Sequence, residues 1–86
     1  MAAAANAADT NNGSRLYARH CVSCHGGSGA AAAPGSPSFE RGQNLLRPDV
    51  VLMEATRVGK NAMPAYQGIL TTREILDVIA FMRTLH

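Results

Sequence analysis

The chain has 86 residues, a mass of 9.0 kDa and a formal net charge of +2. Such a length allows one small domain, whose core alone rarely supplies more than about 3–5 kcal/mol of stability. Weak, scattered positive charge argues against nucleic-acid binding, which needs clustered Lys and Arg. The two cysteines exclude a dense disulfide framework, and no apolar run is long enough for a transmembrane helix.

The first eight residues are rich in alanine and lack the charged region and long apolar run of an intact signal peptide. We expect residues 1–8 to be a disordered tail, either a signal-peptide remnant or a cloning scar. Residues 9–86 are then expected to form the single folded domain.

The first predicted helix begins at a polar cap within residues 10–12 and continues to the vicinity of Cys21. A Gly-, Ala- and Pro-rich loop follows over residues 26–38. Long irregular loops are unusual in so small a domain and commonly wrap around something.

The second predicted helix has Pro48 in its first turn and Gly59 as its stop signal. The third has the clearest start, a capping box formed by Thr71 and Glu74, and is expected to run to about Leu85. Because no segment has the pattern of a strand, the sequence predicts an all-α fold with three main helices.

Both cysteines fall in one motif, Cys21-Val22-Ser23-Cys24-His25. A C-x-x-C-H motif is typical of covalent haem attachment. Thiols three residues apart on a helical turn can bond to the two vinyl groups along one side of a porphyrin, and the next residue, His25, can bind the iron. The haem would also supply the apolar body that the small core lacks.

The motif has three other interpretations. A structural zinc site needs four ligands, and His20 and His86 are the only further His or Cys candidates outside the motif. A thioredoxin-like dithiol would need a βαβ context, and no strands are predicted. A simple disulfide leaves the small core unexplained, so haem attachment is the favoured interpretation.

Met63 is the predicted second axial ligand of the iron. It lies in a loop between two predicted helices, and Pro64 restricts its backbone to an extended conformation that can project a thioether inward. Met53 and Met82 lie within helices, where core packing is the simpler role. From the residues alone, the alternative for Met63 is a loop methionine that fills a gap.

The motif and its surroundings resemble the small class I cytochromes c of bacterial respiratory chains. The resemblance covers the chain from Gly13 to Leu85, and its specific parts are the C-x-x-C-H motif, an axial-Met loop and a pair of helix-crossing patterns. The residues that carry the last two are Gly13, Tyr17, Val78 and Phe81 for the crossing and Ala62 to Tyr66 for the loop. The resemblance implies a small cytochrome c fold wrapped around one covalently bound haem c with His25/Met63 ligation.

The resemblance also implies roles for three further residues. The Pro37 carbonyl would accept a hydrogen bond from His25 Nδ1, although the Pro34 carbonyl is an alternative acceptor. Phe39 would pack against the haem. The chain departs from the family in having no Trp to contact a haem propionate, and Arg41 is the expected substitute, with Arg47, Gln43 and Asn44 as alternatives. The complete predicted site is therefore Cys21, Cys24, His25, Met63, Pro37, Phe39 and Arg41.

The predicted function is single-electron transfer between periplasmic or membrane redox proteins, without catalysis, because both axial positions of the iron are filled. Two alternatives stay open: an accessory cytochrome of a denitrification reductase or its cofactor-maturation pathway, and a haem sensor or enzyme that binds a small ligand after Met63 dissociates. A nitrite reductase is one candidate partner. We expect an exported, periplasmic protein that is a monomer with weak self-association.

Overall fold

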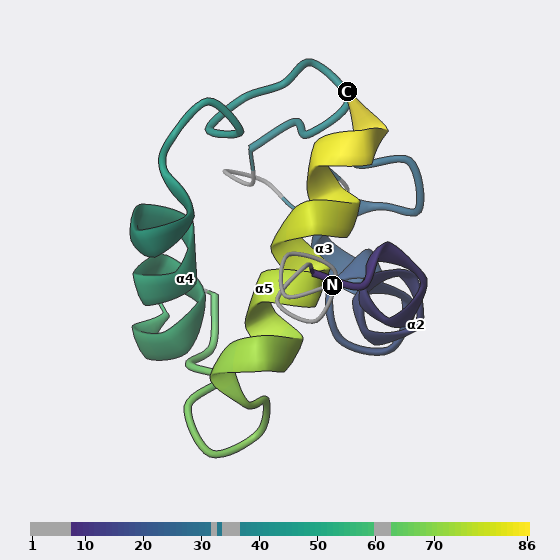
Figure 1. Ribbon diagram of the computed structural model, residues 1–86. Coiled ribbons are helices and arrows are strands. Elements are labelled where there is room, and N and C mark those ends of the chain that lie inside the picture. The colour runs from purple at the N-terminus through teal and green to yellow at the C-terminus, as the bar shows by residue number, and fades with distance from the viewer. Residues whose placement is uncertain (1–7, 32, 34–36, 60–62) are drawn as a thin grey trace.

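The computed structural model describes residues 8–31, 33, 37–59 and 63–86. Its helices are α2 (Thr10–His20), α3 (Val22–His25), α4 (Asp49–Val58) and α5 (Thr72–Met82), with a 3-10 helix over Arg83–Leu85 (Figure 1). In these ranges the chain forms no strand. Met63, Gln67 and Leu70 take part in isolated bridges, and Gln67 pairs with Leu70. The predicted all-α fold with three main helices, here α2, α4 and α5, is confirmed.

Some predicted features lie outside the described residues. These are nearly all of the expected tail, together with Pro34 and Ala62. None of the helices in the described ranges is both long and apolar enough to cross a bilayer.

The cap of helix α2 lies one residue before the predicted range. Asp9, in an extended conformation, is the cap, and its carboxylate accepts hydrogen bonds from the backbone N–H groups of Asn11 and Asn12 at 2.9 and 3.0 Å. The prediction of a cap within residues 10–12 is therefore wrong. The N–H groups of Asn11 and Asn12 lie in the first turn of the helix and need an acceptor, which the Asp9 carboxylate supplies.

Helix α4 begins directly after Pro48, which occupies the cap position rather than the first turn, and it ends at Gly59 as predicted. Gly59 has a φ of 75°, a conformation that favours glycine. Its Cβ would also lie 2.6 Å from the Met63 carbonyl oxygen, so the absence of a side chain lets the following loop fold back on the helix end.

Helix α5 has the predicted capping box at its start: Thr71 Oγ1 accepts from the Glu74 N–H, and the Glu74 carboxylate accepts from the Thr71 N–H. The α-helix ends at Met82, short of the predicted Leu85. The chain tightens there into a 3-10 turn, in which the Thr84 hydroxyl donates to the Phe81 carbonyl at 2.6 Å.

Helices α2 and α5 cross in close contact at Gly13. A Cβ at Gly13 would lie 2.0 Å from the Asp77 carbonyl oxygen and 3.0 Å from Phe81 Cβ. One turn later the rings of Tyr17 and Phe81 pack at a centroid distance of 5.3 Å. The expected close approach of the first and last helices is confirmed, with Phe81 half-buried at its edge.

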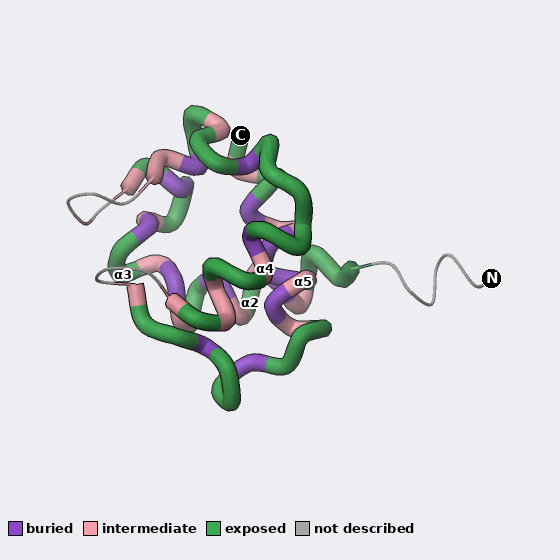
Figure 2. Tube along the Cα trace, turned by 90° about the vertical axis from the view of Figure 1, so that its left-hand side faces the viewer, coloured by how far each residue is buried: buried purple, intermediate pink, exposed green. Residues whose placement is uncertain are grey.

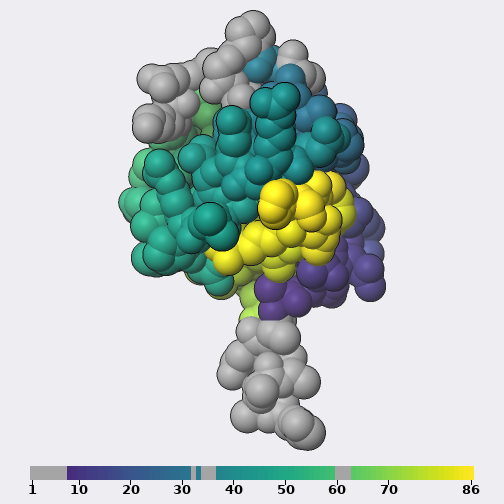
Figure 3. All heavy atoms as spheres, turned by 90° about the horizontal axis from the view of Figure 1, so that it is seen from above, coloured from purple at the N-terminus to yellow at the C-terminus, as the bar shows by residue number. Residues whose placement is uncertain are grey.

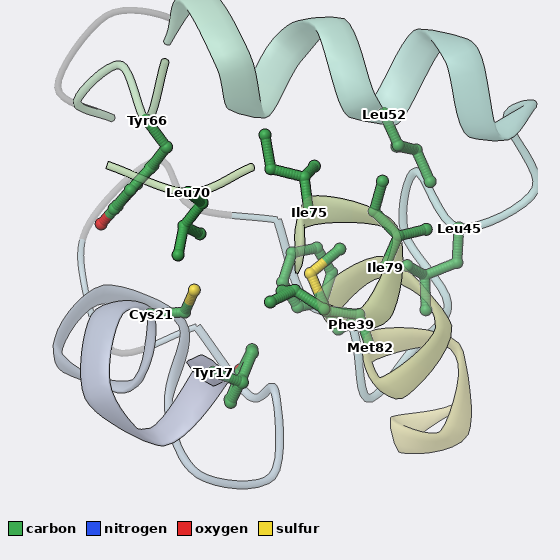
Figure 4. Close-up of a cluster of buried hydrophobic side chains, with 11 residues drawn as sticks. Tyr17, Cys21, Phe39, Leu45, Leu52, Tyr66, Leu70, Ile75, Ile79 and Met82 are labelled. Atoms are coloured by element: carbon green, nitrogen blue, oxygen red, sulfur yellow. The ribbon is translucent and has the colours of Figure 1, made fainter. Parts of the chain in front are cut away.

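The core is assembled from the three main helices and the loops between them. Figure 2 shows the buried positions distributed along these segments, and Figure 4 shows their side chains converging. The buried apolar residues are Tyr17, Cys21, Phe39, Leu45, Leu52, Tyr66, Leu70, Ile75, Val78, Ile79 and Met82.

The C-terminal turn holds the long loop that precedes α4. Arg83 donates to the Arg47 carbonyl at 2.8 Å and pairs with the Asp49 carboxylate at 2.8 Å. In Figure 3 the yellow C-terminal segment accordingly lies against the teal segment that leads into α4. This contact holds the segment before α4, which carries the buried residues Phe39 and Leu45, against the C-terminal turn.

Candidate haem site

The C-x-x-C-H motif forms a single helical turn after α2. Cys21 lies at the junction of α2 and α3, and the His25 N–H donates to the Cys21 carbonyl at 2.9 Å. The Cys21 side chain is buried and that of Cys24 is exposed, and both are free thiols. The motif therefore presents one thiol to the core and the other to the surface, without the disulfide of one alternative interpretation.

Two tyrosine hydroxyls fix the ends of this turn. The Tyr17 hydroxyl donates to the Gly26 carbonyl at 2.6 Å, just after His25. The Tyr66 hydroxyl donates to the His20 carbonyl at 3.0 Å, just before Cys21. Burial first, and the nearby Cys21 second, raise the pKa of Tyr17 to about 12, so this hydroxyl stays a protonated donor at neutral pH.

His25 lies in the interior with its ring stacked on Phe39 at a centroid distance of 4.6 Å and an interplanar angle of 22°. Burial lowers the pKa of His25, which favours the neutral imidazole that binds metals. Its Nδ1 is buried without a hydrogen-bond partner among the described residues. Metal-ligating histidines normally donate a hydrogen bond from this second ring nitrogen, and no described residue supplies the acceptor for His25.

Of the three loop residues with predicted roles, only Phe39 stacks on another residue of the predicted site within the described chain. Phe39 is buried directly against the His25 ring. Pro37 is half-buried, but in the described chain its carbonyl accepts no bond from His25, so that role stays a prediction. Arg41 is exposed, and within the described residues only its backbone N–H has a hydrogen-bond partner, so its propionate contact stays a prediction as well.

The buried thiol is held in its protonated form. Burial first, and the neighbouring Cys24 second, raise the pKa of Cys21 to about 11. In Figure 4 its sulfur points from the end of α2 toward Leu70, inside the wall of apolar side chains. It is this apolar setting that suits attachment of an apolar group at Cys21.

Met63 is half-buried and packs against the core cluster that contains Cys21 and Phe39. Its loop is tied to the end of α4, because the Tyr66 and Gln67 N–H groups donate to the carbonyls of Thr56 and Arg57 at 3.1 and 3.0 Å. Met82 is buried and Met53 is half-buried within helices, as their predicted packing roles require.

These residues fit a haem better than a zinc ion. Within the described part of the chain, no three His, Cys, Asp or Glu side chains gather in a group that could hold a metal ion. The donors present are a neutral imidazole, two thiols and a thioether, and apolar side chains surround Cys21. This combination suits covalent attachment of a large apolar cofactor whose iron takes nitrogen and sulfur ligands.

Comparison with known proteins agrees with the chemistry of the site. The family model described as "Cytochrome C oxidase, cbb3-type, subunit III" matches residues 8–82. The chain belongs to the class I monohaem cytochrome c family. The predicted covalent haem c, and the predicted role as an electron carrier rather than an enzyme, are confirmed by this membership.

Relatives of this cytochrome include cytochrome c6 of Thermosynechococcus vestitus, which is 33% identical over 92% of this chain and 72% of the relative. A cytochrome c6-like protein of Nostoc sp. is 34% identical over 91% of this chain and 72% of its own length. The crystal structure of cytochrome c6 from the diatom Phaeodactylum tricornutum superimposes with a TM-score of 0.73 at 28% identity, covering 88% of this chain and 92% of that one. These names lend no support to a nitrite reductase as the partner.

Sequence reasoning missed one polar residue that holds the helices on which the site is built. Asp77 is buried on α5, where its carboxylate accepts from the Asp9 N–H at 2.7 Å and from Asn12 Nδ2 at 2.9 Å. Arg73 Nε lies 3.9 Å from the same carboxylate. The available signal was an acidic residue between Leu76 and Val78 on a largely apolar helix face.

Proposed function

We propose that this cytochrome carries single electrons with a haem attached at Cys21 and Cys24 and ligated by His25 and Met63. The observation that supports this best is the shared core. Cys21 from the attachment turn, Phe39 beneath His25, and Met63 from the loop before α5 all pack in one cluster. Met63 and the Phe39 ring on which His25 stacks thus belong to one cluster, although they come from distant parts of the sequence.

The chemistry of the ligands suits electron transfer. When bound, the haem would supply a reversible one-electron couple, and His25 and Met63 would hold its iron, a ligand pair that raises the reduction potential. The buried, neutral His25 and the thioether of Met63 are both uncharged donors, so neither needs to gain or lose a proton when the charge on the iron changes. Phe39, stacked on the His25 ring, keeps that ligand in one orientation.

Partners are proposed to dock on an uncharged face. Residues 20–39 and 61–72 contain no Asp, Glu, Lys or Arg, and these segments carry the attachment turn and the Met63 loop. Cys24, Pro64 and Ala65 are exposed there. We propose a transient, mainly apolar contact with a redox protein in the periplasm, by a monomer that self-associates weakly through the same face.

The ligand set is tested by the ferric absorption spectrum. Methionine ligation gives a weak far-red charge-transfer band, and Met63→Ala is expected to abolish it and to lower the reduction potential. Met53→Ala is the matched control, because Met53 is also half-buried against the core but lies in α4. A band that survives Met63→Ala, or disappears in Met53→Ala, would show that the assignment is wrong.

A further inference from the structure

Tyr66 bridges two parts of the haem site that are far apart in the sequence. Its side chain is 8% exposed, and its hydroxyl donates to the His20 carbonyl at 3.0 Å. Its ring also meets the His20 ring edge-on, with centroids 5.6 Å apart and an interplanar angle of 73°. His20 directly precedes Cys21, and Figure 4 shows the Tyr66 side chain extending toward this end of α2.

The backbone of Tyr66 is fixed as firmly as its hydroxyl. Its N–H donates to the Thr56 carbonyl at 3.1 Å, and its carbonyl accepts from the N–H groups of Ile69 and Leu70 at 2.9 Å each. Within the described residues, the Tyr66 hydroxyl provides the hydrogen bond that joins residues 63–70 to residues 20–25. One residue thus ties the end of α4 to the start of the attachment turn, three positions after Met63.

The backbone between Met63 and this fixed point lies against Gly59 at the end of α4, but this contact is packing rather than hydrogen bonding. Pro64 and Ala65 are exposed, and among the described residues neither of their backbones makes a hydrogen bond. The Met63 side chain is held by packing against the core. Displacement of Met63 by another ligand would be eased by lifting the loop, and among the described residues after Met63, Tyr66 is the first whose hydrogen bonds resist that movement.

We infer that Tyr66 is a positioning residue that fastens the Met63 loop to the haem-attachment turn and so keeps Met63 in place as a ligand. The inference rests on the proposed His25/Met63 ligation. Without the hydroxyl, the same ring would still fill its place in the core, but the loop would open more often. The iron would then become accessible to external ligands.

The hydroxyl, rather than the ring, is the part to test. Burial first, and the nearby Cys21 and Cys24 second, raise the pKa of Tyr66, so the group is a neutral donor under ordinary conditions. Tyr66→Phe removes this donor and keeps the ring. Tyr17→Phe is the matched control. The Tyr17 hydroxyl also donates to a backbone carbonyl, that of Gly26, but this bond lies at the other end of the attachment turn.

The experiment measures imidazole binding to the ferric holoprotein. Tyr66→Phe is expected to increase the rate and affinity of binding by about two- to thirteenfold, the range that corresponds to the net free energy of one hydrogen bond. Tyr17→Phe should bind as the unaltered protein does. Because each variant loses one comparable bond, both should lose similar global stability, which separates loop opening from general weakening.

Two results overturn the inference alone: unchanged imidazole binding by Tyr66→Phe, or an equal increase in Tyr17→Phe, while the far-red band is present in the unaltered protein. Absence of that band in the unaltered protein overturns the proposed ligation, and the inference with it. If Tyr66→Phe fails to mature, deuterium exchange is measured on the unaltered protein with and without saturating imidazole. The Tyr66 and Gln67 amides should exchange faster with imidazole bound, and unchanged exchange overturns the inference.

Discussion

The close crossing at Gly13 allows a prediction in which helix propensity and packing have opposite signs. In an ordinary exposed helix position, Gly→Ala stabilises by about 1 kcal/mol. At Gly13 the new Cβ would lie 2.0 Å from the Asp77 carbonyl oxygen and 2.5 Å from its carbon, whereas Cβ atoms essentially never approach within 3.0 Å. Both are backbone atoms of α5, so no side-chain rotation can relieve the contact. The two helices must instead separate by about 1 Å at this point.

Such a separation should cost about 2–3 kcal/mol, the upper part of the range for overpacked sites, because it also loosens Tyr17 against Phe81. After the propensity gain is subtracted, Gly13→Ala is expected to lower the free energy of unfolding by about 1–2 kcal/mol. Gly13→Val should cost more, since the larger side chain meets the same backbone.

The assay is urea unfolding of the ferric holoprotein followed by far-ultraviolet circular dichroism. A shifted midpoint at constant slope reports a change in stability. Ala18→Gly, at an exposed position of α2, calibrates the propensity of this helix and should cost about 1 kcal/mol. A Gly13→Ala protein as stable as the original, or more stable, would refute the close crossing.

Two other predictions concern the buried carboxylate and the uncharged face. Asp77→Asn places an amide NH₂ group against one of two donors, the Asp9 N–H or Asn12 Nδ2. It should lower the free energy of unfolding, measured in urea, by about 1–3 kcal/mol. Asp49→Asn, which loses an exposed ion pair, should cost at most about 1 kcal/mol, and equal costs would contradict the buried role. Electron transfer to a redox partner should change little between low and physiological salt in stopped-flow measurements, because only charged contacts are screened over about 8–10 Å. Ala65→Lys should weaken partner binding without altering the absorption spectrum, whereas Ala18→Lys, the control, should leave partner binding unchanged. A steep fall of the electron-transfer rate with salt would exclude an uncharged docking face.

The features predicted correctly from the sequence are those set by neighbours along the chain. Thr71 and Glu74 form their capping box within one turn, and Gly59 ends its helix through its own backbone conformation. Cys21 and His25 come onto one turn because their spacing matches the helix repeat. The close approach at Gly13 is a contact between distant segments, and it was expected only because the pattern resembles a known family.

Three of the contacts that the sequence did not reveal have a common physical origin: one partner in each is a backbone group. Tyr66 donates to the carbonyl of His20, Tyr17 donates to that of Gly26, and Asp77 accepts from the N–H of Asp9. Every residue type except proline offers the same N–H and carbonyl, so the backbone partner leaves no trace in the sequence, and spacing cannot suggest which one is used.

What the sequence does show is the other half of each pair, a polar atom on a side chain that must be buried. Asp77 on an apolar helix face and Tyr66 beside the Met63 loop were visible in this way. A buried donor or acceptor requires a partner, so such residues indicate where the chain must bring a distant backbone segment. In this cytochrome the segments brought in are the two ends of the attachment turn and the start of α2, so these hidden contacts hold the framework on which the haem ligands depend.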